Sequence, residues 1–213
     1  AEERLRLGHV QHGRAQRIAA KKETVSQRLA AKRKLVETIG GQLSDAYWIA
    51  ESDDVIALNL VQFQAARELS DALSIHCEYY PARGATLVTV IATDHPGLFY
   101  RIAGGIHLAG GNIIDARIHT ARNGMALDNF LVQDPLGRPF MEEDQLARLK
   151  TAIGDALANR VKLVPQLAAK PHARPRTEAF TVRPRVIFDN DASSRFTVVE
   201  VNGGANSVGT QFT

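Results

Sequence analysis

The chain has 213 residues, a net charge of +3 and a hydrophobic fraction of 45%, which is ample for a packed core. This length allows one or two compact domains, and no apolar run is long enough to span a membrane. A single cysteine, Cys77, excludes an intrachain disulfide and a cysteine-rich zinc site. We therefore expect a cytoplasmic protein with no membrane partner. The first residues lack the apolar core of a signal peptide, so we expect them to continue from a longer chain.

Charge is unevenly distributed along the sequence. Residues 14–34 carry eight basic residues against one acid, and residues 160–185 carry seven against one. Residues 35–159 between them hold 8 basic and 16 acidic groups. A basic segment can bind nucleic acid, but no aromatic residue that could stack on a base precedes Tyr47. Solvated helix faces or linkers are therefore the favoured interpretation, and we expect no nucleic-acid partner.

Two amphipathic helices are predicted in the first 70 residues. The first ends at Gly40-Gly41 and carries one apolar stripe: Ile18, Val25, Leu29 and Val36. The second starts after Ser52, a suitable N-cap, and carries apolar residues on one face: Ile56, Leu60 and Phe63. Together they form a helical lead-in that could bridge to an upstream domain, and neither contains a catalytic motif.

From about residue 87 the pattern changes to short strands alternating with helices. Five elements are predicted in turn: a strand at 86–93, a helix at 97–111, strands at 112–120 and 125–134, and a helix at 142–159. Asn123-Gly124 is the strongest hairpin signal in the chain. After a Pro- and Arg-rich linker, residues 185–191 add a strand, which gives a ferredoxin-like βαββαβ unit of the α+β class. One further strand, predicted at 195–202, is more than this unit contains.

Two features inside these elements predict close contacts. Strand 112–120 alternates between an apolar side, formed by Ile114, Ala116 and Ile118, and a polar side, formed by Asp115, Arg117 and His119. One half of this strand is therefore expected to face solvent or a partner. Gly104 and Gly105 lie inside a helix, where each costs about 1 kcal/mol relative to alanine, so we expect them to pack closely against another backbone.

The junction Asp94-His95-Pro96-Gly97 joins a strand to a helix. Asp94 can cap the helix, Pro96 suits its first turn and Gly97 permits close backbone approach. A helix N-terminus with a glycine also presents N–H groups to an anion, such as the carboxylate of an amino acid. Both interpretations use the same atoms, and from the residues alone a helix cap without ligand is favoured.

The segment "TDHPGLFYRIAGGIHLAGGNIIDARIHTARNGMALDNFLVQD", residues 93–134, resembles an ACT domain. It is most similar to the first of the tandem ACT domains that close the bacterial bifunctional uridylyltransferase/uridylyl-removing enzymes. The resemblance extends over nearly the whole chain, from "GHVQHGRAQRIAAKKE" to "RPRVIFDNDASSRFTVVEVNG". An Asp-x-Pro-Gly-Leu turn alone would indicate only an ACT-like fold, whereas the ordered series of segments is typical of this family.

The resemblance implies three parts. Residues 1–83 are a helical lead-in from an upstream catalytic region, and residues 84–192 are the ACT domain, with the linker 165–184 before its last strand. Residues 193–213 hold the first strand of a truncated second ACT domain and a divergent tail, "GANSVGTQFT". The loss of that domain bears on ligand binding, because ACT ligands commonly lie where two such domains meet.

The resemblance also implies a glutamine-sensing role in an enzyme that attaches UMP to the nitrogen-signalling protein PII and removes it. The transferase reaction needs a Gly-Ser followed by an Asp-x-Asp, and no Gly-Ser precedes Asp189-Asn190-Asp191. The hydrolase reaction needs an adjacent His-Asp pair, which the sequence also lacks. We therefore expect this chain to be non-catalytic by itself. We expect no metal site or cofactor in it, the magnesium belonging to the parent enzyme.

The ligand residues implied by the resemblance lie in two groups, expected at one end of the sheet. Asp94, His95, Gly97 and Leu98 lie at the helix start, and Asn112, Ile113 and Ile114, at the start of the next strand, line the neighbouring wall or that of a partner domain. The implied partners are glutamine or another amino acid, PII through the parent enzyme, and a second ACT domain or a second copy. Two alternatives stay open. An ACT module of another enzyme would share the turn but not the helical lead-in, and a nucleic-acid-binding module would need aromatic-rich strands that are missing here.

Overall fold

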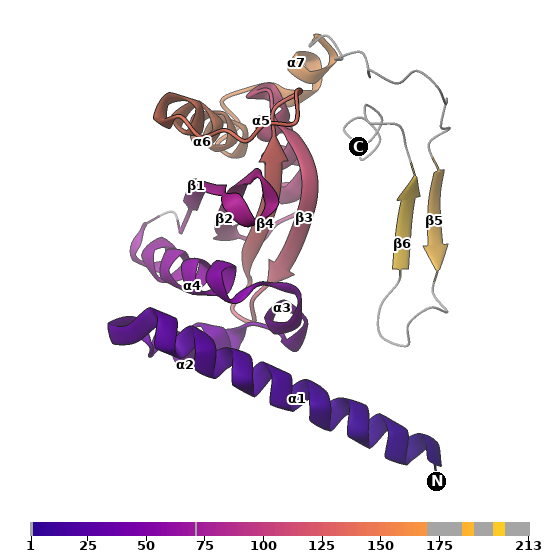
Figure 1. Ribbon diagram of the computed structural model, residues 1–213. Coiled ribbons are helices and arrows are strands. Elements are labelled where there is room, and N and C mark those ends of the chain that lie inside the picture. The colour runs from indigo at the N-terminus through magenta and orange to yellow at the C-terminus, as the bar shows by residue number, and fades with distance from the viewer. Residues whose placement is uncertain (1, 71, 170–184, 190–197, 203–213) are drawn as a thin grey trace.

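The computed structural model describes residues 2–70, 72–169, 185–189 and 198–202 (Figure 1). Helices come first: α1 Glu2–Leu29, η1 Ala30–Lys32, α2 Leu35–Thr38, η2 Gly40–Gln42, α3 Asp45–Ala50 and α4 Asp53–Glu68. Strands and helices then alternate: β1 Ser74–Tyr80, η3 Pro81–Arg83, β2 Ala85–Thr93, α5 Leu98–Leu108, β3 Asn112–Thr120, β4 Met125–Gln133, α6 Glu143–Leu157 and α7 Leu163–Ala169. Two further strands are β5 Arg185–Asp189 and β6 Val198–Asn202. The predicted α+β class, with a helical segment first, is confirmed.

A four-stranded antiparallel sheet, in the spatial order β1-β2-β4-β3, lies between two layers of helices (Figure 1). The helices α5 and α6 cover one face, with a core that includes Ile102, Phe130 and Ile153. The helical segment α1–α4 covers the other face, where Phe63 packs in one cluster with Leu127. The central strands β2 and β4 are buried at every residue but the last because both of their faces are covered. No helix among the described residues has the length and hydropathy needed to cross a bilayer.

The fourth strand of the sheet is not the one predicted from the sequence. Residues 185–189 form β5, but β5 pairs antiparallel with β6 and does not join the four-stranded sheet. The additional strand predicted at 195–202, beyond the βαββαβ unit, therefore corresponds to β6 and has β5 as its partner. The place beside β2 is taken by β1, which lies inside the range 1–83 assigned to the lead-in. The short turn η3 and Gly84, at a φ of 54°, connect β1 to β2, and such a local hairpin closes with less loss of chain entropy than a strand beyond a long linker.

The first predicted helix is broken into two. Helix α1 ends at Leu29, and Ala30 takes a φ of 47°, which ends the regular turn before η1 and α2. The apolar stripe is buried on both sides of this break, because Val25 and Val36 enter the same core. The second predicted helix is confirmed as α4, with Ser52 as its N-cap.

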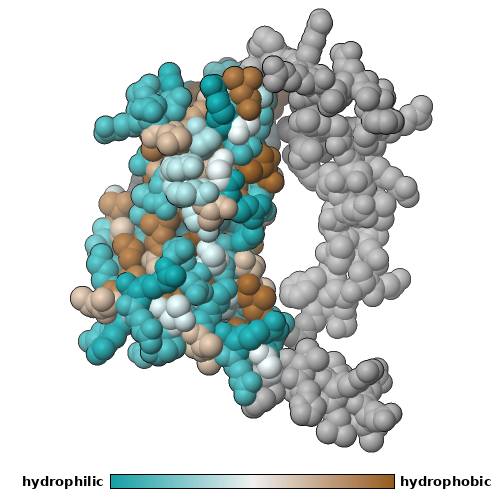
Figure 2. Space-filling view, in the orientation of Figure 1, coloured by the Kyte–Doolittle hydropathy of each residue, from teal (hydrophilic) through white to brown (hydrophobic). Residues whose placement is uncertain are grey.

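The edge strand β3 changes the direction of its side chains at a register shift between Ile113 and Asp115. Ile113 pairs with Val132 of β4, and Asp115 pairs with the adjacent Leu131. The side chains of Ile113 and Asp115 therefore lie on opposite faces of the sheet. The polar side of β3 is consequently half-buried against the helical segment. The apolar side is the open one: Ile114 and Ile118 are each 47% exposed. Figure 2 shows hydrophobic patches within a mostly hydrophilic surface, including on the side of the molecule where β3 lies.

The two glycines inside α5 allow it to approach its neighbours closely. A Cβ added at Gly105 would lie 2.7 Å from the Cα of Ile153 and 2.9 Å from the carbonyl oxygen of Ala152, both in α6. The predicted close packing against another backbone is therefore confirmed at this position. A Cβ at Gly104 would lie 2.9 Å from the methyl carbon Cδ2 of Leu163, which is the end of a flexible side chain.

This difference predicts the effects of two alanine substitutions. Gly105→Ala should lower the free energy of unfolding by roughly 1–3 kcal/mol, because the helix backbones must separate. Gly104→Ala should change it by less than about 1 kcal/mol, because Leu163 can move and alanine favours the helix. Urea denaturation followed by circular dichroism measures both. A Gly105→Ala chain as stable as Gly104→Ala would contradict the packing argument.

Candidate ligand site

The junction before α5 is a tight turn, but Asp94 does not cap the helix as predicted. Gly97, at a φ of 83°, is the N-cap residue and makes no side-chain cap hydrogen bond. Two turn residues separate Asp94 and His95 from the first helical residue, so the Asp94 carboxylate is too far back to reach the first-turn amides. Its Oδ2 accepts a hydrogen bond from Oγ1 of Thr120 at 2.9 Å instead. The positive φ makes glycine necessary at position 97.

The two predicted groups of ligand residues lie at opposite ends of the sheet within one chain. Asp94 follows the end of β2 and lies beside Thr120, the last residue of β3. Asn112, at the start of β3, pairs with Gln133 at the other end of β4. The expectation that all seven residues share one end is therefore wrong, because α5 carries the chain back along the sheet before β3 begins. Whether these residues bind a ligand stays a prediction.

The structure adds Asp128 to the junction. Asp128 lies on the central strand β4, is 1% exposed, and its Oδ1 has no hydrogen-bond partner among the described residues. Burial and the nearby charge of Asp94 raise the pKa of Asp128 to about 7, although the His119 N–H and charge oppose the shift. Sequence reasoning missed this residue. The signal was an acid followed by one polar residue, Asn129, within a strand that is otherwise apolar from Met125 to Val132.

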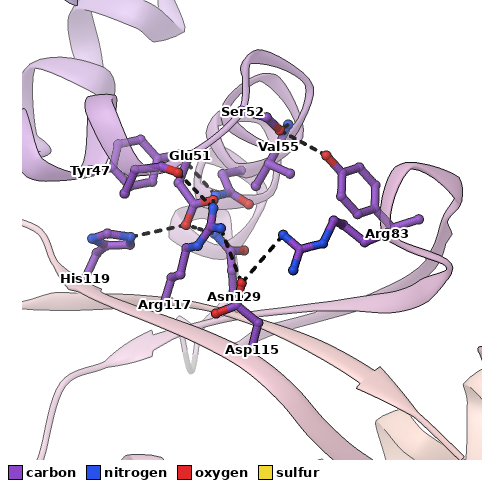
Figure 3. Close-up of polar contacts among 12 residues, drawn as sticks. Tyr47, Glu51, Ser52, Val55, Arg83, Asp115, Arg117, His119 and Asn129 are labelled. Atoms are coloured by element: carbon purple, nitrogen blue, oxygen red, sulfur yellow. Dashed lines mark hydrogen bonds and ion pairs between the residues drawn. The ribbon is translucent and has the colours of Figure 1, made fainter. Parts of the chain in front are cut away.

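A second polar region lies on the opposite face of the sheet, where the helical segment meets β3 and β4 (Figure 3). It borders a cavity of about 370 Å³ between these layers. Five charged residues line the cavity: Lys21, Glu51, Arg83, Asp115 and Arg117. Apolar residues complete its wall, among them Val55, Leu87 and Leu131. None of these residues was predicted as a site, although the alternation of β3 placed Asp115 and Arg117 on one side.

Glu51 is the centre of this region. This residue connects α3 to α4 in the chain and is 3% exposed. Oε1 accepts from Nδ2 of Asn129 at 3.0 Å and lies 3.2 Å from Nε2 of His119, while Oε2 accepts from Nη1 of Arg117 at 3.2 Å. Burial favours a higher pKa for Glu51, but the hydrogen bonds from His119 and Asn129 and the charge of Arg117 outweigh it and lower the pKa. The carboxylate is therefore ionised and fully engaged.

The other charged groups of the cavity are less completely paired. Arg117 Nη2 donates to Oδ2 of Asp115 at 3.3 Å, and its Nη1 also donates to the carbonyl oxygen of Ala50 at 2.8 Å. Nη1 of Arg83 lies 4.0 Å from the same Asp115 oxygen, beyond hydrogen-bond distance. Lys21 Nζ donates to the carbonyl oxygen of Glu51. Arg83 and Asp115 are 50% and 29% exposed, so solvent reaches this end of the cavity.

The element order and sheet topology define an α+β protein, with a helical segment packed on a four-stranded antiparallel sheet, compatible with a ferredoxin-like fold. The chain is 72% identical over 201 residues to the bifunctional uridylyltransferase/uridylyl-removing enzyme of Novosphingobium aromaticivorans, a match covering 94% of this chain and 22% of that enzyme. It is 67% identical over 202 residues to the enzyme of the same name from Erythrobacter litoralis, covering 95% of this chain and 22% of that enzyme.

A third relative, from Zymomonas mobilis, has the same name and is 44% identical over 191 residues, which cover 89% of this chain and 21% of that enzyme. The chain thus spans about a fifth of the length of the curated relatives it matches. No family model matches the chain. No solved structure matches it.

The raised pKa of Asp128 predicts how stability changes with pH. In the folded chain Asp128 keeps its proton up to about pH 7, whereas the unfolded residue releases it near its ordinary value of 3.8. This stabilising contribution is fully present below 3.8 and is lost as pH rises through about 7. Asp128→Asn keeps the neutral shape, so it should exceed the wild type in stability by roughly 1–4 kcal/mol at about pH 8 and match it at about pH 4.

Urea denaturation of both proteins across this pH range measures the difference. Asp144→Asn is the control, because the Asp144 side chain is 74% exposed on α6 and should show little pH-dependent difference. A difference between Asp128→Asn and wild type that does not vary with pH would contradict the assignment of a protonated Asp128.

Proposed function

We propose that this chain is the amino-acid-sensing regulatory region of an enzyme that attaches UMP to PII and removes it, with glutamine as the amino acid sensed. The observation that supports the proposal most strongly is the 72% identity over 201 residues to a bifunctional uridylyltransferase/uridylyl-removing enzyme. That match includes the helical segment as well as the sheet, which favours this family over an ACT module from another enzyme. The regulatory role and the ligand rest on the resemblance of residues 93–134 to ACT domains.

In this proposal the chain changes the activity of catalytic domains elsewhere in the parent enzyme, in the cytoplasm. Magnesium would be needed by those domains and not by this region. The helical segment packs on one face of the sheet, so a change at the sheet would be passed to α1 and from there toward the preceding domains.

The predicted ligand residues can be brought together by a second copy of this unit. Among the described strands β3 is an edge with no partner on its outer side, and Thr120 at its end lies beside Asp94. If two copies pair antiparallel along β3, Asn112 and Ile113 of one copy come next to the junction of the other. A second ACT domain of the parent enzyme could take the same place. The exposed side chains of Ile114 and Ile118 would be covered in either arrangement.

We predict that the chain forms dimers through β3. Light scattering at high micromolar concentration should give twice the mass of the chain, and Ile118→Lys should give the mass of one chain because the charge lies on the paired edge. Val164→Lys, which places the same charge at a residue 62% exposed on α7, should leave the dimer intact. A wild-type monomer at this concentration would count against the arrangement.

We also predict the effect of two substitutions at the junction on glutamine binding, measured by calorimetry on this chain and on one extended by the second ACT domain. Asp94→Asn should weaken binding about tenfold, because a charged contact to the ligand amino group is lost. Gly97→Val should abolish it, because valine cannot adopt the φ of 83° without strain. Asp144→Asn on α6 is the matched control.

Circular dichroism shows whether each variant remains folded. If the extended chain binds no glutamine, the sensing role is wrong. If it binds glutamine equally well after both substitutions in folded protein, the junction is only a turn.

A further inference from the structure

The cavity between the helical segment and the sheet carries an excess of positive charge once its internal bonds are counted. Three basic residues and two acids line it, and Glu51 is fully engaged by His119, Asn129 and Arg117 (Figure 3). The charged lining residues that remain are Lys21 and Arg83 against one acid, Asp115. The Arg83 guanidinium stands 4.0 Å from that acid, too far for a hydrogen bond, and is 50% exposed.

An arginine in this position matches an oxyanion. Its planar guanidinium can donate two parallel hydrogen bonds to a carboxylate, and the Lys21 ammonium adds a second positive charge to the same cavity. The hydroxyl groups of Tyr80 and Ser52, 3.1 Å apart, are further polar groups at the wall. Because the neighbouring wall is apolar, with Val55, Leu87 and Leu131, the ligand needs a short hydrocarbon body as well as its charge.

We propose that this cavity binds a small organic anion through its carboxylate, with Arg83 and Lys21 as the principal contacts. The volume of about 370 Å³ is within the range of small-molecule sites and accommodates a four-carbon dicarboxylate. The site lies on the face of the sheet opposite the Asp94 junction and is separate from the proposed glutamine site. This region would then bind two ligands of different charge: a zwitterionic amino acid at the junction and an anion in the cavity.

Asp115 opposes the anion in this arrangement. Its carboxylate is 29% exposed, holds Nη2 of Arg117 at 3.3 Å and is the acid nearest to Arg83. An incoming carboxylate must compete with Asp115 for these guanidinium groups. A zwitterionic amino acid would instead use Asp115 to hold its ammonium group. Removing the Asp115 charge therefore separates the two ligand classes by the direction of the effect.

A bound anion would also join the two layers. Lys21 comes from α1, whereas Arg83 comes from the turn between β1 and β2. A ligand that contacts both stabilises the helical segment on the sheet, and the stability of the folded chain rises with the logarithm of ligand concentration once this exceeds the Kd. Binding can therefore be measured without any enzymatic activity.

The experiment titrates succinate, with acetate as a smaller probe, into the full chain by calorimetry. Wild type should bind succinate, and Arg83→Gln should bind it about tenfold more weakly because the bidentate partner is lost. Asp115→Asn should bind it severalfold more tightly, because a competing negative charge is removed. Arg148→Gln is the charge-matched control, since that arginine is 72% exposed on α6 and should leave affinity unchanged.

Fluorescence of Trp48, the single tryptophan, reports whether each variant is folded, because this side chain is 1% exposed in the native core. The urea midpoint of wild type should rise with succinate, and that of Arg83→Gln should rise less. Absence of succinate binding to the wild type overturns the proposal. So does unchanged affinity in folded Arg83→Gln, or weaker binding in Asp115→Asn. Glutamine affinity should be the same in the wild type, Arg83→Gln and Asp115→Asn, since neither substitution touches the junction. Weaker glutamine binding in Asp115→Asn would place an amino acid in this cavity and overturn the assignment to an anion.

Discussion

The attachment of the helical segment to the sheet depends on the buried carboxylate of Glu51. Glu51 lies in the chain between α3 and α4. The partners of its carboxylate come from two strands: His119 and Arg117 on β3 and Asn129 on β4. A buried charge is tolerated only when it is paired and hydrogen-bonded, and leaving one unpaired costs roughly 3–5 kcal/mol. The position of the strands relative to the helices is therefore fixed by directional bonds as well as by apolar contact.

A chain of hydrogen bonds extends this polar contact into the core. Asn129 Oδ1 accepts from Thr89 Oγ1 at 2.8 Å, and Thr89 Oγ1 also lies 3.4 Å from Asn59 Oδ1. Asn59 Nδ2 in turn donates to the hydroxyl oxygen of Tyr47 at 3.1 Å. The Tyr47 ring in turn packs edge-on against the imidazole of His119, with centroids 4.9 Å apart. Buried polar groups that are satisfied in this way specify one arrangement of the two layers. The other face of the sheet differs, because Oδ1 of Asp128 there has no partner in the part of the chain that the structure describes.

The sequence allowed prediction of features that depend on near neighbours. The cap at Ser52, the Asn123-Gly124 hairpin and the close backbone contact of α5 all follow from short patterns, and the structure has each of them. The strand β1 was missed although Ile75, Cys77 and Tyr79 alternate with His76 and Glu78 in "SIHCEYY", because this run was assigned to the helical lead-in. The role of Glu51 could not be predicted, since its partners lie 66 to 78 positions further along the chain. The contact of Asp94 with Thr120 is of the same kind, because it depends on how strands pair.

The register shift between Ile113 and Asp115 constrains how this segment can change in length during evolution. One additional residue at that point turns Asp115, Arg117 and His119 toward the helical segment. Deletion of this additional residue would turn every later side chain of β3 to the opposite face of the sheet in a single step. The imidazole and guanidinium would then leave Glu51, and isoleucine side chains would meet its carboxylate. Single substitutions along the open side alter one contact at a time, so we expect this strand to tolerate changes of residue far better than insertions or deletions.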